Sequence, residues 1–219
     1  MNYLLDKIID SCLAARSFFD QSPFGKESQV YWVRRNQIFP GFDSGFRTDA
    51  VGLFSATPKT IADEIAESVH AETIVDAFCG IGCTAIAFAR AGKKVITADL
   101  DANRLAMARH NAALLNTNKD IEFITADIFT VIGTKKADAI FLDPPWGGVG
   151  YEKIVNFKLT NFELDCTKLL EESFKNYSKV ILRVPRQFDF RELEKFAKKY
   201  TVQENKIRSK VYSKTVYFE

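Results

Sequence analysis

The chain has 219 residues, 47% of them hydrophobic and 26% charged, which is the composition of an ordinary globular protein with a sizeable core. The formal net charge of +2 argues against a long grip on duplex nucleic acid, but it is compatible with a small anionic ligand or one end of an RNA. No apolar run approaches the roughly 18 residues of a membrane span, and the first residues lack a signal-peptide pattern. We therefore expect an intracellular protein with no membrane partner.

The four cysteines, Cys12, Cys79, Cys83 and Cys166, form no paired pattern. Cys79 and Cys83 are four apart, but no second pair of Cys or His stands nearby to complete a tetrahedral zinc site. We therefore expect no metal and interpret the cysteines as small buried apolar residues.

The first 57 residues differ in texture from the rest and are expected to form a helical or irregular extension. Residues 3–19 carry apolar side chains at helical spacing, which predicts a short amphipathic helix. Residues 20–57 are rich in Gly, Pro, Ser and aromatic residues. Thr57 and Pro58 predict the start of the next helix, because Thr is a favourable N-cap and Pro a favourable first helical residue. The core domain is expected to span residues 58–219.

From residue 73 the sequence alternates between short apolar strands and helices. The expected strands are 73–78, 94–98, 121–125, 137–142 and 179–184, and the expected helices are 84–91, 103–115 and 162–176. This alternation predicts an α/β fold with a mostly parallel sheet and helices on both faces. Residues 201–208 and 214–218 predict two more strands, an antiparallel hairpin at the edge, which gives seven strands in all.

A glycine turn follows the first expected strand. Gly80, Gly82 and Ala85 fit the small-residue fingerprint of doubly wound folds, in which a ligand approaches the backbone. Asp99 closes the second strand, where a carboxylate can accept hydrogen bonds from both ribose hydroxyls. Taken alone, these features are equally compatible with a nicotinamide dehydrogenase or with a purely structural turn.

Two further acidic residues favour a cationic adenosine cofactor. Asp76 precedes the glycines, where an anion suits the ammonium group of a methionine moiety and would repel a pyrophosphate. Asp127 closes the third strand, where it can accept a hydrogen bond from an adenine amino group, although it can also simply cap the following turn. Acidic residues at three successive strand ends predict S-adenosylmethionine as the cofactor.

The strongest signal is the run Asp-Pro-Pro-Trp-Gly-Gly at residues 143–148, directly after the fourth strand. The two prolines hold a rigid extended turn. This turn presents the Asp143 carboxylate and the Pro144 carbonyl as fixed acceptors for an exocyclic amine, and Trp146 offers a stacking face for a base. The alternative is a purely structural turn. We predict Asp143, Pro144 and Trp146 as the catalytic residues of an amino-methyltransferase that acts on a nucleobase.

Together these motifs resemble the trimethylguanosine synthase family, the cap guanine-N2 methyltransferases of small nuclear and nucleolar RNAs. The resemblance covers about residues 30–219. The residues that carry it are Tyr31-Trp32, Phe39, Phe54-Ser55, Thr57-Pro58, Asp76, Phe78-Cys79-Gly80, Asp99, Asp101, Ile121-Glu122-Phe123, the Pro-Pro-Trp-Gly-Gly run and Pro185-Arg186.

The resemblance implies a class I, Rossmann-like methyltransferase fold whose N-terminal extension completes the pocket for the 7-methylguanosine (m7G) cap. It also implies a nuclear enzyme, which we expect to be a monomer, acting on m7G-capped small nuclear and nucleolar RNA. The residues implied for S-adenosylmethionine are Phe54, Thr57, Asp76, Phe78, Gly80, Asp99, Asp127 and Asp143. Those implied for the substrate are Ser55, Pro145, Trp146, which stacks on the 7-methylguanine, and Arg186, which reaches the cap phosphates.

The sequence departs from the family pattern at two places. Several members carry Ser where this chain has Asp143, the form typical of the wider amino-methyltransferases. Some relatives contact phosphate through a basic residue before the Tyr-Trp pair, where this chain has Gln29-Val30, and Arg34 or Arg35 is the candidate substitute. Two alternatives stay open: a guanine-N2 or adenine-N6 methyltransferase of ribosomal or transfer RNA, and a non-catalytic cap-binding module.

Overall fold

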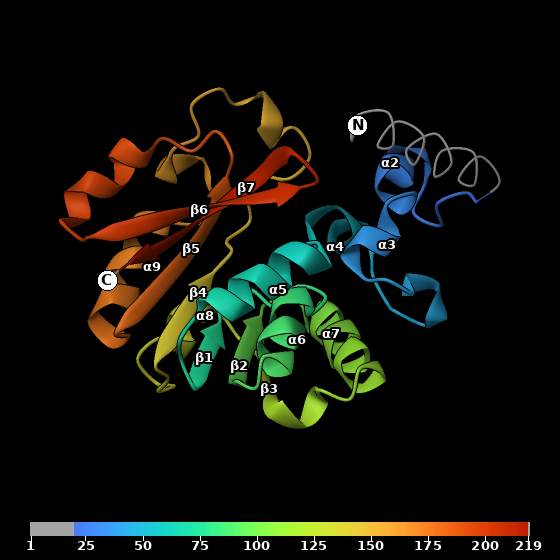
Figure 1. Cartoon of the computed structure of the whole chain (residues 1–219), viewed down its shortest axis with the longest axis horizontal. Coiled ribbons are helices and arrows are strands. Elements are labelled where there is room, and N and C mark those ends of the chain that lie inside the picture. Colours follow the sequence, from blue (N-terminus) through green and yellow to red (C-terminus); the bar gives the residue numbers. More distant parts are fainter. Residues whose placement is uncertain (1–19, 219) are drawn as a thin grey trace.

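The computed structural model describes residues 20–218, which form a seven-stranded sheet of order β3-β2-β1-β4-β5-β7-β6. The strands are β1 (Thr73–Asp76), β2 (Lys94–Asp99), β3 (Ile121–Thr125), β4 (Ala139–Leu142), β5 (Lys179–Pro185), β6 (Tyr200–Ile207) and β7 (Lys210–Phe218). Strands β1 to β5 are parallel, and β7 runs antiparallel to both β5 and β6 (Figure 1). The predicted mostly parallel sheet with a C-terminal antiparallel hairpin is confirmed, with β6 as the outer strand.

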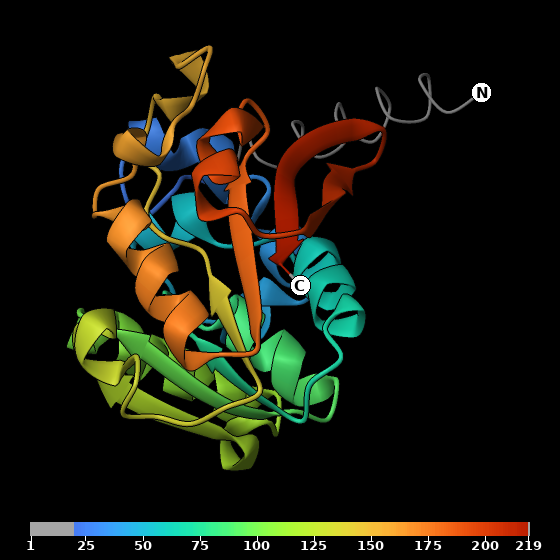
Figure 2. The same ribbon diagram turned by 90° about the vertical axis from the view of Figure 1, so that its left-hand side faces the viewer.

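Helices cover both faces of this sheet (Figures 1 and 2). One face carries α5 (Lys59–Ser68), α6 (Cys83–Arg90) and α7 (Ala102–Leu114). The other carries α8 (Ile128–Val131), α9 (Cys166–Asn176) and η6 (Phe190–Phe196). The remaining short turns of the core are η3 (Asn118–Asp120), η4 (Tyr151–Lys153) and η5 (Leu159–Asn161). No helix within residues 20–218 combines the length and the apolar character needed to cross a membrane.

The central strands are buried on both faces, as expected for a parallel sheet between two helical layers. In β4, Ala139 and Phe141 pack into the cluster beneath α5 and α6, whereas Ile140 and Leu142 pack into the cluster beneath α8 and α9. The apolar runs read from the sequence therefore mark strands of the sheet interior.

The N-terminal extension packs beside the start of α6 and along α7. Its elements are η1 (Lys26–Ser28), α2 (Gln29–Trp32), α3 (Arg35–Ile38), η2 (Phe42–Ser44) and α4 (Ala50–Ser55). The extension buries Ile38, Phe42, Phe46 and Leu53 together with Ile81 of the glycine turn. The helix predicted at residues 3–19 lies outside the described residues.

Two predicted helix starts are wrong. The helix predicted from residue 162 begins at Cys166, because Asp165 caps it by accepting a 2.9 Å hydrogen bond from the backbone N–H of Lys168. Helix α5 begins at Lys59, and the Thr57 hydroxyl points instead into a buried ion pair described below. A hydrogen bond to a charged group is stronger than a neutral cap.

The strand order reverses between β1 and β4. In open parallel sheets, such a point leaves a crevice at the carboxyl ends of the strands, where ligands bind. Asp76, the last residue of β1, lies opposite Phe141 of β4, and Asp143 follows two residues later. The two carboxylates therefore belong to the same crevice.

Candidate functional site

Asp76 lies fully buried at the carboxyl end of β1. Its Oδ2 accepts a 2.9 Å hydrogen bond from the Thr84 hydroxyl, whereas its buried Oδ1 has no hydrogen-bond partner among residues 20–218. Burial raises the pKa of Asp76 to about 7, the Thr84 hydrogen bond opposes that rise, and the nearby charge of Asp143 adds to it. A buried carboxylate oxygen without a partner suits a cationic group of a ligand.

Asp99 joins the end of β2 to the glycine turn. Its Oδ2 accepts a 2.7 Å hydrogen bond from the backbone N–H of Gly80, and its Oδ1 accepts one of 2.9 Å from that of Asp101. Gly80 has a φ of +52°, and a Cβ added there would meet nothing within 4 Å. A Cβ at Gly82 would instead lie 3.0 Å from the Cβ of Ala108 in α7. Gly80 thus borders open space, while Gly82 permits close helix packing.

Asp127 and Phe78 complete the set of residues predicted around the cofactor on the core side. Asp127 is exposed and caps α8, accepting a 2.9 Å hydrogen bond from the backbone N–H of Phe129. The capping contact that the sequence allowed is therefore present. Phe78 is half-buried and packs against the core cluster beneath α8 and α9.

Asp143 stands at the centre of a closed set of polar contacts. Its Oδ2 accepts a 2.6 Å hydrogen bond from Nη1 of Arg183 and a 3.3 Å hydrogen bond from the Thr57 hydroxyl. The Thr57 oxygen in turn accepts a 2.9 Å hydrogen bond from the same Arg183 nitrogen. Burial raises the pKa of Asp143, while Arg183 and Thr57 hold that rise back. Oδ1 of Asp143 makes no hydrogen bond within residues 20–218, which leaves it for a ligand.

Arg183 is a site residue that sequence reasoning missed. It belongs to β5, where its neighbours Leu182 and Val184 are fully buried, and its own side chain is 2% exposed. A charged residue in the middle of an apolar strand is a signal that could have been used, since such a charge must be paired.

Trp146 is half-buried and lies among aromatic side chains from several elements. Tyr151 meets it edge to face at 5.1 Å between ring centres, Phe54 lies 6.3 Å from Tyr151, and Tyr31 lies 5.1 Å from Phe54. The Arg183 guanidinium carbon stands 4.8 Å from the centre of the Trp146 ring. The extension therefore reaches Trp146 through Tyr31, Phe54 and Tyr151. Tyr151 is a second residue that sequence reasoning did not single out.

The turn that carries Trp146 needs its glycines. Gly147 and Gly148 have φ values of +95° and +70°, a region in which other residues are strained. Pro144 is buried, whereas Pro145 is exposed. The predicted proline turn is thus held in the protein interior at Pro144 and reaches the surface at Pro145.

The remaining predicted substrate residues, Ser55 and Arg186, are exposed. The Ser55 hydroxyl donates to the Val51 carbonyl one helical turn earlier, at 2.9 Å. Of the two candidate phosphate arginines of the extension, Arg35 is held by Asp20 and by Asp43, at 2.6 Å from the latter, whereas Arg34 is exposed. Arg34 is thus the better placed of the two.

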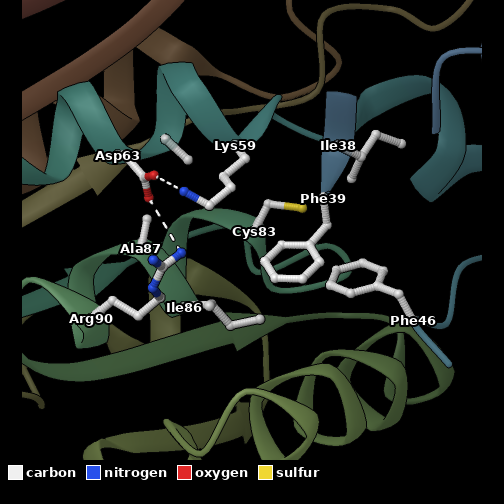
Figure 3. A pocket seen from close by; sticks show the side chains of 10 residues that line it. Ile38, Phe39, Phe46, Lys59, Asp63, Cys83, Ile86, Ala87 and Arg90 are labelled. Carbon is white, nitrogen blue, oxygen red and sulfur yellow. Dashed lines mark hydrogen bonds and ion pairs between the residues drawn. The ribbon is translucent and has the colours of Figure 1, made fainter. Parts of the chain in front are cut away.

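Two hollows elsewhere in the structure are poor candidates. Figure 3 shows the smaller one, between α5, α6 and the extension, where Lys59 and Arg90 pair with Asp63. Its volume of about 10 Å³ is room for about one water molecule. The other, of about 650 Å³, lies between the extension and the start of α7. Neither is lined by Asp76, Asp99 or Asp143.

A sequence model of the RNA cap guanine-N2 methyltransferases matches residues 71–218, which include all the strands described above. The chain belongs to the RNA cap guanine-N2 methyltransferase family. The reaction is therefore the S-adenosylmethionine-dependent methylation of guanine N2 in an RNA cap. This excludes the nicotinamide dehydrogenase as well as the non-catalytic module.

Two curated relatives agree with this family, and one solved structure shares the fold. The chain is 29% identical to trimethylguanosine synthase of Schizosaccharomyces pombe over 86% of its own length and 80% of that protein. It is 29% identical to trimethylguanosine synthase of Saccharomyces cerevisiae over 77% of its length and 58% of that protein. A putative methyltransferase from Porphyromonas gingivalis W83 shares the fold, with a TM-score of 0.69 and 17% identity over 93% of this chain and 53% of that one.

The crevice fits the cofactor of this family. The unpartnered Oδ1 of Asp76 suits an ammonium group, and the open space beside Gly80 allows a ligand to approach the backbone. S-adenosylmethionine supplies the electrophilic methyl group when it is bound, so the protein's own work is orientation and exclusion of water.

Proposed function

We propose that the crevice between β1 and β4 holds the cofactor and that the turn at residues 143–148 holds the m7G base with its N2 amine toward the methyl group. The observation that carries this proposal is that Arg183 and Thr57 fix Oδ2 of Asp143, while the same guanidinium lies 4.8 Å from the centre of the half-buried Trp146 ring. An exocyclic amine donates hydrogen bonds, so a fixed carboxylate oxygen and the Pro144 carbonyl can orient it.

In this proposal Asp143 acts as an acceptor and not as a strong base. The amine attacks while neutral, and the nitrogen loses its proton after the new bond to carbon has formed. A carboxylate already bound to a guanidinium is a weak proton acceptor, but it is a well-oriented hydrogen-bond acceptor. The geometry therefore supports catalysis by orientation.

The other predicted residues surround these two sites in the proposal. Asp76, Phe78, Gly80, Asp99 and Asp127 hold the cofactor from the core, and the segment from Phe54 to Thr57 closes over it. Pro145 and Ser55 border the base, and Arg186 contacts the cap phosphates. We further propose that residues 1–57 form an extension that completes the cap pocket of the core at 58–219, and that Arg34 of this extension adds a phosphate contact.

By resemblance to the trimethylguanosine synthases, the proposed substrates are m7G-capped small nuclear and nucleolar RNAs, methylated in the nucleus by a monomeric enzyme. Mass spectrometry of m7GTP after incubation with the protein and S-adenosylmethionine tests the reaction and counts the methyl groups added. A gain of one or two methyl groups on m7GTP is expected, with GTP methylated much more slowly. Methylation of ribosomal or transfer RNA with no reaction on m7GTP would replace this proposal with the ribosomal or transfer RNA alternative.

A further inference from the structure

Arg183 is buried at a cost that its contacts must offset. A guanidinium taken out of water is tolerated only when it is paired with a charge and its N–H groups are hydrogen-bonded. Here Nη1 donates hydrogen bonds to Asp143 and Thr57, and Nε donates a 3.2 Å hydrogen bond to the Ser213 hydroxyl of β7. Each of these partners comes from a different element, so the guanidinium is fixed from several directions.

The same guanidinium also lies against rings. Its central carbon is 4.8 Å from the centre of Trp146 and 5.8 Å from the centre of Tyr212. Both contacts are within cation–π range. Arg183 therefore touches the carboxylate that the proposed function assigns to the amine and the ring that it assigns to the base.

We propose that Arg183 is a positioning residue that fixes the Asp143 carboxylate and the Trp146 ring relative to each other. The inference rests on the proposed function, in which Asp143 orients N2 and Trp146 stacks on the same base. Because one guanidinium contacts both groups, it fixes the distance between the Asp143 carboxylate, which accepts from the amine, and the Trp146 ring, on which the base stacks. Asp143 and Arg183 then act as one unit.

The test is a double-mutant cycle on m7GTP with the variants Arg183→Met, Asp143→Ser and the double variant. Methionine is long and apolar, so it fills much of the same space without a charge. Arg183→Met is expected to lower kcat by between about tenfold and about a hundredfold, the loss typical of a misplacement of about 1 Å. If Arg183 acts on turnover through Asp143, its removal in the Asp143→Ser background changes kcat by no more than about twofold, the scatter of independent effects.

Loss of contact with Trp146 has its own readout. Because the ring keeps its place in the turn but loses its support, KM for m7GTP is expected to rise in Arg183→Met with or without Asp143. The effect of Arg183→Met on kcat should thus depend on Asp143, whereas its effect on KM should not. A residue that only stabilises the fold is not expected to separate kcat from KM in this way.

The pH profile provides a second readout. Burial raises the pKa of Asp143 and Arg183 holds it back, so in Arg183→Met the carboxylate is protonated up to a higher pH. The acid limb of kcat is expected to move to higher pH in this variant and to be absent from the double variant. The other titratable groups that face Asp143 are Asp76, Tyr151 and Tyr212. Saturating S-adenosylmethionine and the Asp143→Ser background separate their contribution.

Controls distinguish a positioning role from a structural one. Arg191→Met removes another ion-paired arginine, which is 74% exposed and pairs with Asp189 at 2.6 Å, and should leave kcat, KM and the pH limb unchanged. Thermal unfolding of the cofactor-free variants reports folding, because Arg183 contacts Thr57 and Asp143, two of the residues expected beside the cofactor. Arg183→Lys, which keeps the charge, should recover part of the lost turnover.

Several results would overturn the inference. One such result is an Arg183→Met variant with the turnover and pH dependence of wild type. Another is a double variant whose loss of kcat equals the product of the losses in the two single variants. If Arg183→Met shows no cooperative thermal unfolding, the comparison of Asp143→Ser with the double variant decides. A double variant that also fails to fold assigns Arg183 to structure alone. A wild-type protein that does not methylate m7GTP would instead contradict the proposed function.

Discussion

The carboxylate of Asp99 accepts a 2.7 Å hydrogen bond from the backbone N–H of Gly80, so the end of β2 and the turn after β1 form one wall of the crevice. Asp99→Ala is expected to weaken S-adenosylhomocysteine binding by about 1–3 kcal/mol, the scale of a lost hydrogen bond to a charged group. Binding of m7GTP should be nearly unchanged, because the proposed function places Asp99 beside the cofactor and not beside the base. Calorimetry with both ligands measures this. Unchanged cofactor affinity would remove Asp99 from the site.

Asp76 makes cofactor affinity depend on pH. Its pKa is raised by burial to about 7, and only the ionised carboxylate attracts an ammonium group. The affinity for S-adenosylmethionine is therefore expected to increase between about pH 6 and pH 8. Thr84→Val removes the hydrogen bond that favours the ionised form and should shift this increase to higher pH. An Asp76→Asn variant with the same pH dependence as wild type would assign the effect to another group.

The same residue affects stability in the opposite sense. A raised pKa means that the folded state binds more protons than the unfolded state between about pH 4 and pH 7, so the free energy of unfolding falls as pH rises through this window. Asp76→Asn lacks this loss. In thermal unfolding of the cofactor-free protein, the Tm of Asp76→Asn minus that of wild type should increase as the pH rises. A difference that is constant with pH would contradict a raised pKa.

Trp146 is expected to discriminate m7GTP from GTP. Methylation at N7 gives guanine a positive charge, and a desolvated cation–π contact adds on the order of 2 kcal/mol, or about thirtyfold in catalytic efficiency. Arg183 lies against the same ring, but its charge is balanced by Asp143. Trp146→Ala should erase most of the preference and Trp146→Phe should keep part of it. The measurement is the ratio of kcat/KM for the two nucleotides, and a wild-type ratio near one would contradict a cap pocket.

Arg186 is expected to act on the phosphates without reading the base. Arg186→Ala should therefore weaken m7GTP and GTP by a similar factor and leave their ratio unchanged, since phosphates do not report N7 methylation. Arg191→Ala, which removes another exposed arginine, is the matched control. The comparison uses KM for both nucleotides. A change in the ratio would mean that Arg186 contacts the base.

Much of the fold was predictable because its signals are local. The apolar runs of β1 to β5 report burial on both faces, and each strand has an aspartate or a proline at its carboxyl end or within two residues after it. The carboxyl ends of parallel strands meet at one edge, so Asp76, Asp99 and Asp143 could be placed together from sequence order alone.

The parts that were missed depend on contacts between distant segments. The Thr57 hydroxyl meets a carboxylate 86 residues away and a guanidinium 126 residues away. Local propensity assigned Thr57 to a helix cap, and the tertiary ion pair overrode that preference. In the same way, no local pattern shows that Arg183 pairs with Asp143, which lies 40 residues earlier.

The position of β7 between β5 and β6 has a consequence for the emergence of the chain from the ribosome. Strand β5 gains its second neighbour only when residues 210–218 have been made, and until then it is the open edge of the growing sheet. An open apolar edge invites pairing with other chains. A charge that points inward on such an edge discourages that pairing, and Arg183 supplies one on β5. The residue proposed to align the finished site is therefore also expected to discourage aggregation of the nascent sheet until β7 covers this edge.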